Sequence, residues 1–257
     1  MRTRHIAQAV RPHAANRWLY RNTATVVTVT EAIRRQYLAA GLGAPERVVT
    51  LAGGADTGAY RPRPRDSETY RRLGGDDRPL VGMIAGLRVM KGHRVVVDAA
   101  ARLARMGRRP RFVFIGRGPL AEPVREAIRG AGLDGQVGVA GWVDDLPAAM
   151  AALDLGLYVP LESDGMSRVV FEYLAAGCPL IAARVGVVPE ALVDGEHALL
   201  VAAGDADALS DALGRSLADP ALRDRLGRAG RRLVEERYSG ERLAGALETL
   251  YGRILGA

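Results

Sequence analysis

From residue 79 onward, the sequence alternates short apolar runs with segments in which apolar residues recur every three or four positions. Continuous apolar runs are typical of strands buried on both faces, and the spacing of three and four is that of one helix face. Six such runs separated by helical segments predict a doubly wound parallel sheet that binds its ligand at one edge. The predicted strands are Leu80–Ala85, Phe112–Ile115, Val137–Ala140, Leu155–Val159, Leu180–Ala183 and Leu199–Val201.

The segments on either side of this pattern differ from it. Ahead of it, residues 24–29 and Val48–Leu51 are typical of strands, with a helix from Thr30 to Ala40 between them. Two strands are too few for a stable domain. Behind it the chain is mainly helical, and Ser239 suits the N-cap of the last helix because its hydroxyl can accept a free backbone N–H. The predicted C-terminal helices are Asp205–Leu217, Pro220–Arg237 and Ser239–Leu255.

These patterns predict an α/β protein with a Rossmann-like doubly wound parallel sheet and a partial second α/β unit. We expect the first unit to be the remnant of a domain whose beginning is absent. Gly, Pro, Arg and Asp dominate the stretch after it, which is typical of a linker. The expected divisions are a remnant over residues 1–57, a linker over 58–78, a ligand-binding domain over 79–237 and a C-terminal helix over 238–257.

Composition narrows the classes of function. The single cysteine, Cys178, excludes a disulfide framework and a cysteine zinc site, and it favours a reducing cytoplasm. No apolar run approaches the ~18 residues that a membrane span needs. The chain therefore has the composition of a cytoplasmic α/β protein.

The positive charge is concentrated at the start of the chain. Residues 1–35 hold seven arginines and one acid, which accounts for +6 of the net charge of +7. A basic segment over residues 2–35 can contact anionic lipid at the inner face of a membrane, although a solvated helix face explains the charge equally well. Nucleic acid is not an expected partner, because the arginines lack interleaved aromatic residues and a reading motif.

The most informative motif spans residues 160–179, where a strand end is followed by a Gly-containing loop and a helix from about Ser167 to Ala176. The first backbone N–H groups of a helix have no partner within it, and such groups attract phosphate. We expect these free groups on Gly165, Met166, Ser167 and Arg168.

Two acids belong to the same motif. Glu172 lies one turn inside an otherwise apolar helix, where a buried carboxylate needs donors such as sugar hydroxyls. Asp164 precedes the helix. A surface glutamate with Asp164 as a simple helix-start acid is the alternative interpretation.

A pair of cations follows the first strand of the sheet. Lys91 is the single lysine among 36 basic residues, and Arg88 precedes it by three positions. A planar guanidinium and a compact ammonium at this spacing can clamp two phosphates and stabilise departing charge. A solvated pair at a helix start is the alternative, and we expect His93 on the surface there.

A glycine-rich loop follows the second strand. Gly116 and Gly118 with Ala121 satisfy the dinucleotide pattern Gly-x-Gly-x-x-Ala. In dinucleotide-binding folds that pattern follows the first strand, and an acid at the end of the next strand holds the ribose. Here the loop follows the second strand of the sheet, and no acid lies at the end of the next strand. An NAD-dependent oxidoreductase is therefore a minor alternative.

Asp164 and Glu172, with seven residues between them and Ala-Ala-Gly-x-Pro after them, resemble the acid-x7-Glu signature of retaining glycosyltransferase family 4, the glycosyl transferases group 1 of the GT-B fold. Lys91-Gly92 and the Gly-Arg-Gly-Pro loop at residues 116–119 are similar to the same family. The chain departs from the family pattern at Asp164, where Glu is usual, and at Gly86, where many members place the arginine.

The resemblance implies roles for particular residues. Asp164 would contact the transferred sugar, and Glu172 would hydrogen-bond the donor ribose. Arg88 and Lys91 would neutralise the leaving diphosphate. The segment containing Trp142 resembles the one whose backbone meets the nucleobase, with Trp142 either packing or stacking. Asp164, Arg88 and Lys91 are the expected catalytic residues, and the expected donor-binding residues are Arg88, Lys91, Gly116, Gly118, Val143, Asp164, Gly165, Met166, Ser167, Arg168 and Glu172.

The implied activity is transfer of a sugar, with retention, from a nucleoside-diphosphate-sugar donor to a glycan or lipid-linked acceptor. The sequence of residues 164–168, Asp-Gly-Met-Ser-Arg, looks most like that of bacterial members that build lipopolysaccharide or related surface glycans. No metal or cofactor is expected, because the basic pair supplies the neutralising charge. GT-B enzymes use two Rossmann-like halves, so a non-catalytic nucleotide-sugar-binding fragment stays open, as does a GT-B sugar-nucleotide epimerase.

Overall fold

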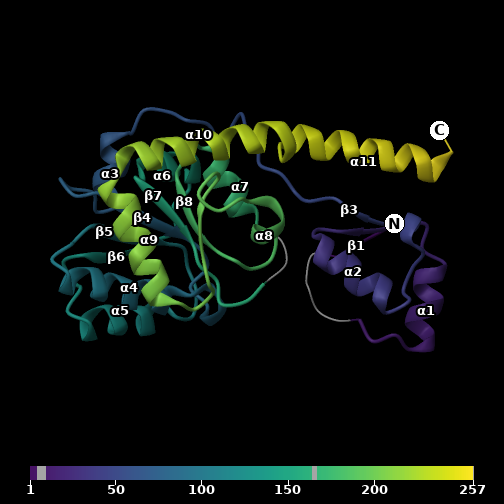
Figure 1. The fold of residues 1–257 in the computed structure, drawn as a ribbon, viewed down its shortest axis with the longest axis horizontal. Helices are drawn as coiled ribbons and strands as arrows, with labels where there is room; N and C mark the ends of the chain where they lie inside the picture. The colour runs from purple at the N-terminus through teal and green to yellow at the C-terminus, as the bar shows by residue number, and fades with distance from the viewer. Residues whose placement is uncertain (5–9, 164–166, 257) are drawn as a thin grey trace.

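The structure is a computed structural model that describes residues 1–4, 10–163 and 167–256. It has two α/β units, and the larger one is built on a six-stranded parallel sheet (Figure 1). The strand order is β6-β5-β4-β7-β8-β9, so the predicted doubly wound parallel sheet is confirmed. The strands are β4 (Leu80–Ile84), β5 (Arg111–Ile115), β6 (Val137–Gly141), β7 (Leu155–Tyr158), β8 (Leu180–Ala183) and β9 (Leu199–Val201).

Helices cover both faces of this sheet because its strands are apolar on both sides. Along β5, Phe112 and Phe114 pack into one core and Val113 and Ile115 into the other, as the two-residue period of a strand requires. One core lies under α4 (His93–Arg105), α5 (Ala121–Gly130) and α9 (Ala206–Ala218). The other lies under α6 (Leu146–Ala152), α7 (Arg168–Ala175), α8 (Val188–Ala191) and the second half of α10 (Pro220–Arg237).

The smaller, N-terminal unit has one strand more than the sequence predicted. Its parallel sheet contains β1 (Arg2–Arg4), β2 (Val26–Thr28) and β3 (Val48–Thr50), with Arg2 in register with Val26. The expectation of two strands was wrong because β1 is polar and forms by backbone pairing to the buried β2. Helices α1 (Ala14–Arg21) and α2 (Glu31–Ala39) complete the unit, whose own core is Tyr20, Val26, Val29, Ile33, Tyr37, Leu42 and Val48.

The segment between the units contains a helix that the linker prediction missed. Helix α3 (Ser67–Arg72) begins after Asp66, whose carboxylate accepts the N–H of Thr69 at 2.7 Å. It packs against α6 of the larger unit. The residues just before the sheet are therefore part of the larger unit's surface.

The chain passes between the units twice, and the two passages are paired. The N–H of Ala55 donates to the carbonyl of Tyr238 at 2.9 Å, and the N–H of Gly240 donates to the carbonyl of Ala55 at 2.8 Å. A side chain at Gly54 would collide with the backbone of Tyr238 and Ser239, so this approach needs glycine. Helix α11 (Gly240–Leu255) then runs out over the N-terminal unit (Figure 1).

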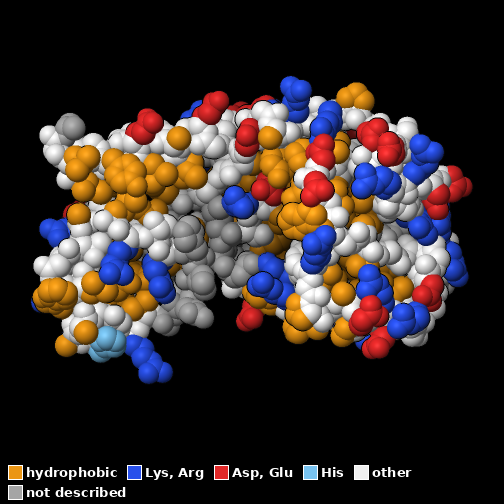
Figure 2. Space-filling model, turned by 180° about the vertical axis from the view of Figure 1, so that it is seen from behind, with side chains coloured by type: hydrophobic (Ala, Val, Ile, Leu, Met, Phe, Trp, Pro, Cys, Tyr) orange, Lys and Arg blue, Asp and Glu red, His pale blue; other side chains and the backbone are white. Residues whose placement is uncertain are grey.

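Ser239 caps α11 as predicted, because its hydroxyl accepts the N–H of Arg242 at 3.3 Å. Within the described ranges, no helix is long and apolar enough to cross a membrane. On the face shown in Figure 2, a notch separates the N-terminal unit from the larger one.

Candidate functional site

The ends of β4 and β7 form the centre of the candidate site. The two strands are neighbours in the sheet, but their connections run in opposite directions from them, which makes this the topological switch point where open α/β sheets bind ligands. A cavity of about 140 Å³ lies there. Lys91 and Ser167 line it, together with residues at the ends of both strands. The structure thus brings the predicted cation and the start of the predicted helix to one cavity.

Backbone contacts hold the Lys91 turn against the segment after β7. The turn is the short 3-10 helix η2 (Val89–Lys91), and the carbonyl of Met90 accepts the N–H of Leu161 at 2.8 Å. Gly92 ends the turn with φ 80°, and a Cβ there would collide with the carbonyl of Val159. Glycine is needed here both for the left-handed backbone and for the close approach.

Arg88 lies at the other side of the same turn. Its backbone is extended immediately before η2, and its side chain is exposed. It lines a cavity of about 290 Å³ between α4 and α5, with His93 and Leu161. Arg88 and Lys91 therefore flank one turn but do not line the same cavity in this structure.

The glycine-rich loop after β5 packs on the loop after β4. Leu87 donates its N–H to the carbonyl of Arg117 at 3.0 Å. Side chains at Gly116 and Gly118 would collide with the backbones of Ala85 and Leu87, and Gly116 has φ 147°. The packing of these two loops accounts for both glycines without a dinucleotide.

Glu172 is half-buried on α7 and has an unusual environment for a carboxylate. Burial raises the pKa of its carboxyl group, and Arg168, one turn earlier, lowers it. The charge of Glu172 in turn adds to burial in raising the pKa of Tyr60, which places that phenol nearby. No residue in the described part of the chain donates a hydrogen bond to the Glu172 carboxylate. A ligand hydroxyl would provide the missing donor.

The loop after β6 presents an exposed aromatic side chain. Trp142 is 58% exposed, which excludes a core-packing role. Its Nε1–H donates to Asp144 at 2.7 Å, and the Arg117 guanidinium lies 5.7 Å from its ring centroid. Val143 turns inward and packs against the core. Trp142, Val143 and Asp144 line a cavity of about 340 Å³.

The predicted helix of the acidic motif is confirmed as α7, which begins at Arg168 after Ser167. Asp164, Gly165 and Met166 lie outside the described residues, so their predicted roles stay predictions. Among described residues, no group of three or more His, Cys, Asp or Glu side chains lies close enough together to hold a metal ion.

His93 is a residue whose position was predicted wrongly. It is 3% exposed, and its ring packs edge-on against Phe114 with centroids 5.1 Å apart. Burial, and then the charge of Lys91, lowers its pKa to about 4. The sequence placed it at the start of a helix beside charged residues, and nothing there indicated that its ring turns inward.

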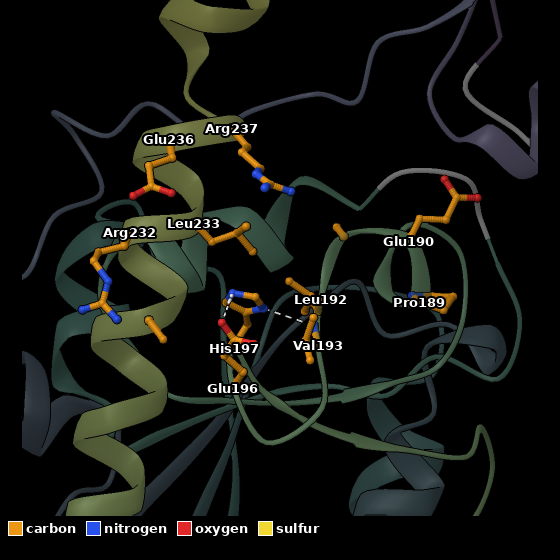
Figure 3. Close-up of a pocket in the computed structure, with 12 residues that line it drawn as sticks. Pro189, Glu190, Leu192, Val193, Glu196, His197, Arg232, Leu233, Glu236 and Arg237 are labelled. Atoms are coloured by element: carbon orange, nitrogen blue, oxygen red, sulfur yellow. Dashed lines mark hydrogen bonds and ion pairs between the residues drawn. The ribbon is translucent and has the colours of Figure 1, made fainter.

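A cavity of about 450 Å³ lies away from these residues, between α8 and α10. His197, Arg232 and Arg237 line it, while Glu190 stands at its edge (Figure 3). None of the predicted donor-binding residues that the structure describes lines it.

Residues 78–219, more than half of the chain, match the family model described as glycosyl transferases group 1. The chain belongs to this family. The match covers β4 to α9, and so includes Arg88, Lys91 and Glu172.

Curated relatives of this chain extend beyond it in length. The 2-deoxystreptamine glucosyltransferase of Streptomyces kanamyceticus is 31% identical over 249 residues, which are 95% of this chain and 64% of that protein. A GDP-mannose-dependent phosphatidylinositol monomannoside mannosyltransferase of Mycolicibacterium smegmatis is 30% identical over 246 residues, with 90% and 63% covered. The chain thus spans less than two thirds of the length of these relatives.

Solved structures show the same GT-B fold. Anabaena HepE, in complex with UDP and glucose, is 22% identical and has a TM-score of 0.86, with 97% of this chain and 70% of that chain covered. The C-terminal domain of a glycosyl transferase group 1 protein of Francisella tularensis is 25% identical with a TM-score of 0.64. That domain is covered to 99% and this chain to 72%, so most of this chain resembles a domain that was crystallised by itself.

Proposed function

We propose that this chain binds a nucleoside-diphosphate-sugar and transfers its sugar to an acceptor. The observation that carries the proposal is the shared cavity of Lys91 and Ser167 at the ends of β4 and β7. An ammonium on one side and a helix start on the other form a site of positive potential at the point where such sheets bind nucleotides.

In the proposed reaction, the chain's charges act on the departing group. Lys91 and Arg88 stabilise the nucleoside diphosphate as the bond to the sugar breaks, and backbone N–H groups at the start of α7 assist. For both cations to contact one diphosphate, the Arg88 side chain would have to move to the side of the η2 turn where Lys91 lines the cavity. Asp164 orients the sugar, and Glu172 accepts hydrogen bonds from the ribose. We propose retention of configuration, as in family 4, and no cofactor besides the donor.

The acceptor is proposed from the relatives. One of them is named for 2-deoxystreptamine and another for a phosphatidylinositol mannoside, so both soluble and lipid-linked acceptors occur among similar proteins. We propose a glycan or lipid-linked acceptor of the cell surface, met in the cytoplasm. Arg17 and Arg21 lie on the exposed side of α1, near an exposed Trp18, which supports the contact of residues 2–35 with an anionic membrane face.

Calorimetric titration with UDP and GDP tests donor binding. Lys91→Met should weaken the binding of the preferred nucleotide by about tenfold or more, because it removes a charge-assisted contact to the diphosphate. Arg94→Gln is the matched control, since Arg94 is an exposed cation on the next helix turn that pairs with Asp98 at 2.9 Å. If the folded protein binds neither nucleotide, the proposal fails.

A non-catalytic donor-binding protein is the second candidate, because the chain covers less than two thirds of its relatives. Release of nucleoside diphosphate in the presence of acceptors separates the two. Binding without release identifies the second candidate, and release identifies the transferase. The NAD-dependent oxidoreductase is not favoured, because loop packing already explains Gly116 and Gly118.

A further inference from the structure

Glu190 joins the two units through its carboxylate. One oxygen accepts the backbone N–H of Glu31 at 2.7 Å, and the other accepts the N–H of Ala32 at 2.8 Å. These residues are more than 150 positions apart in the sequence. In Figure 3 the Glu190 side chain points away from the cavity of His197 and Arg237, towards the N-terminal unit.

The contact completes the cap of α2. The hydroxyl of Thr30, the N-cap residue, accepts the N–H of Ile33 at 3.2 Å. The two preceding amides, of Glu31 and Ala32, have no acceptor among the described residues of the N-terminal unit and donate to Glu190 instead. A carboxylate at the positive end of a helix forms charge-assisted hydrogen bonds, which are stronger than neutral ones.

The topology shows where this contact lies. Helix α2 follows β2, so its first turn stands at the carboxyl edge of the small sheet. Helix α8, which carries Glu190, follows β8 and stands at the carboxyl edge of the large sheet. Lys91 and Ser167 lie at that same edge. Glu190 therefore spans the space between the two sheet edges, on the side where the proposed donor binds.

Among the described residues, each unit has a hydrophobic core of its own. The core of the N-terminal unit consists of its own residues, and the two cores of the larger unit include no residue before Ala55. The paired passages at Ala55 and Ser239 form a narrow connection. Units with separate cores are expected to move relative to each other unless a large apolar interface joins them.

We propose that Glu190 is a positioning residue that holds the N-terminal unit closed over the donor-binding edge by capping α2. Its loss opens the space between the units while leaving each unit folded. The identity of the donor-binding edge rests on the proposed function, whereas the arrangement of the units can be tested without measuring transfer.

The first test is residue-specific amide exchange by NMR on Glu190→Gln. A glutamine offers one acceptor oxygen in place of two and no charge, so the amides of Glu31 and Ala32 should exchange about tenfold faster. The amide of Ile33 is an internal control, because its acceptor is Thr30. Glu236→Gln is the matched variant, since Glu236 borders the same cavity and makes no hydrogen bond to a described residue.

The second test removes one of the two backbone N–H groups of α2 that donate to Glu190. Glu31→Pro deletes the N–H at the first position of α2, where proline is well accepted, and the extended Thr30 before it is compatible with proline. It also deletes the Glu31 side chain, which pairs with Arg34 and accepts from Thr50. Glu31→Ala deletes that side chain but keeps the N–H, so it is the control.

Small-angle X-ray scattering then reports the arrangement. Glu190→Gln and Glu31→Pro should raise the radius of gyration, whereas Glu236→Gln and Glu31→Ala should leave it at the wild-type value. Unchanged radii in both of the first two variants, with each folded by circular dichroism, would overturn the proposal. Equal radii in Glu31→Pro and Glu31→Ala would also overturn it.

Discussion

His93 shows how a single buried side chain adds a pH dependence to stability. Its folded pKa, about 4, lies below the ordinary value of 6.5, because burial disfavours the charged ring. Between these values the unfolded chain binds more protons, so the contribution of His93 is complete above pH 6.5 and is lost as the pH falls to 4. The loss amounts to about 3 kcal/mol.

Urea unfolding at a series of pH values measures this effect. The wild-type free energy of unfolding should fall between pH 6.5 and 4, and His93→Gln should lack about 3 kcal/mol of that fall because glutamine does not titrate. A variant whose stability falls as steeply as that of the wild type would contradict the assignment.

At the scale of elements, the turn of Lys91 depends on its contact with the end of β7. Gly92→Ala places a methyl group against the carbonyl of Val159 and strains a left-handed backbone. Gly107 has a similar φ of 75°, but nothing lies within 4 Å of a side chain placed there. Gly107→Ala should therefore cost about 1–2 kcal/mol of stability, the backbone cost alone.

Gly92→Ala should cost more than Gly107→Ala and should also weaken nucleotide binding, because Lys91 moves with the turn. Thermal unfolding and calorimetric titration of both variants measure the two effects. Equal losses in the two variants, with equal nucleotide affinity, would show that the contact with Val159 does not matter.

The sequence was informative where elements are apolar or capped. Helix α10 begins and ends where predicted, because Pro220 suits a first helical position and Asp219 caps it at 2.9 Å. The parallel, doubly wound arrangement of the six strands follows from their alternation with helices. In contrast, β1 is a polar tripeptide whose pairing depends on the neighbouring strand β2. The spacing of apolar residues along the sequence does not indicate such a strand.

The sequence was likewise informative for only part of the candidate site. The neighbourhood of Lys91 and Ser167 could be predicted, because parallel strands end at one edge of a sheet. The separation of Arg88 from Lys91 could not, because it depends on the direction each side chain takes from a three-residue turn. The contact of Glu190 with α2 joins distant segments and depends on how the two units meet.

For the whole molecule, the decisive feature is that the two passages between the units lie side by side. All buried residues of the large unit's cores fall between Ala55 and Val234. A protein consisting of residues 55–239 should therefore unfold cooperatively and bind nucleoside diphosphate with the affinity of the whole chain. Thermal melts followed by circular dichroism, and calorimetry, check this, and a non-cooperative melt would refute it.

Because Ala55 and Ser239 are paired, the polypeptide enters and leaves the large unit at neighbouring positions. The segment between these two residues can be exchanged in one piece, because only two neighbouring junctions have to match those of the recipient protein. Exchange of this segment between members of the family would leave the N-terminal unit unaltered.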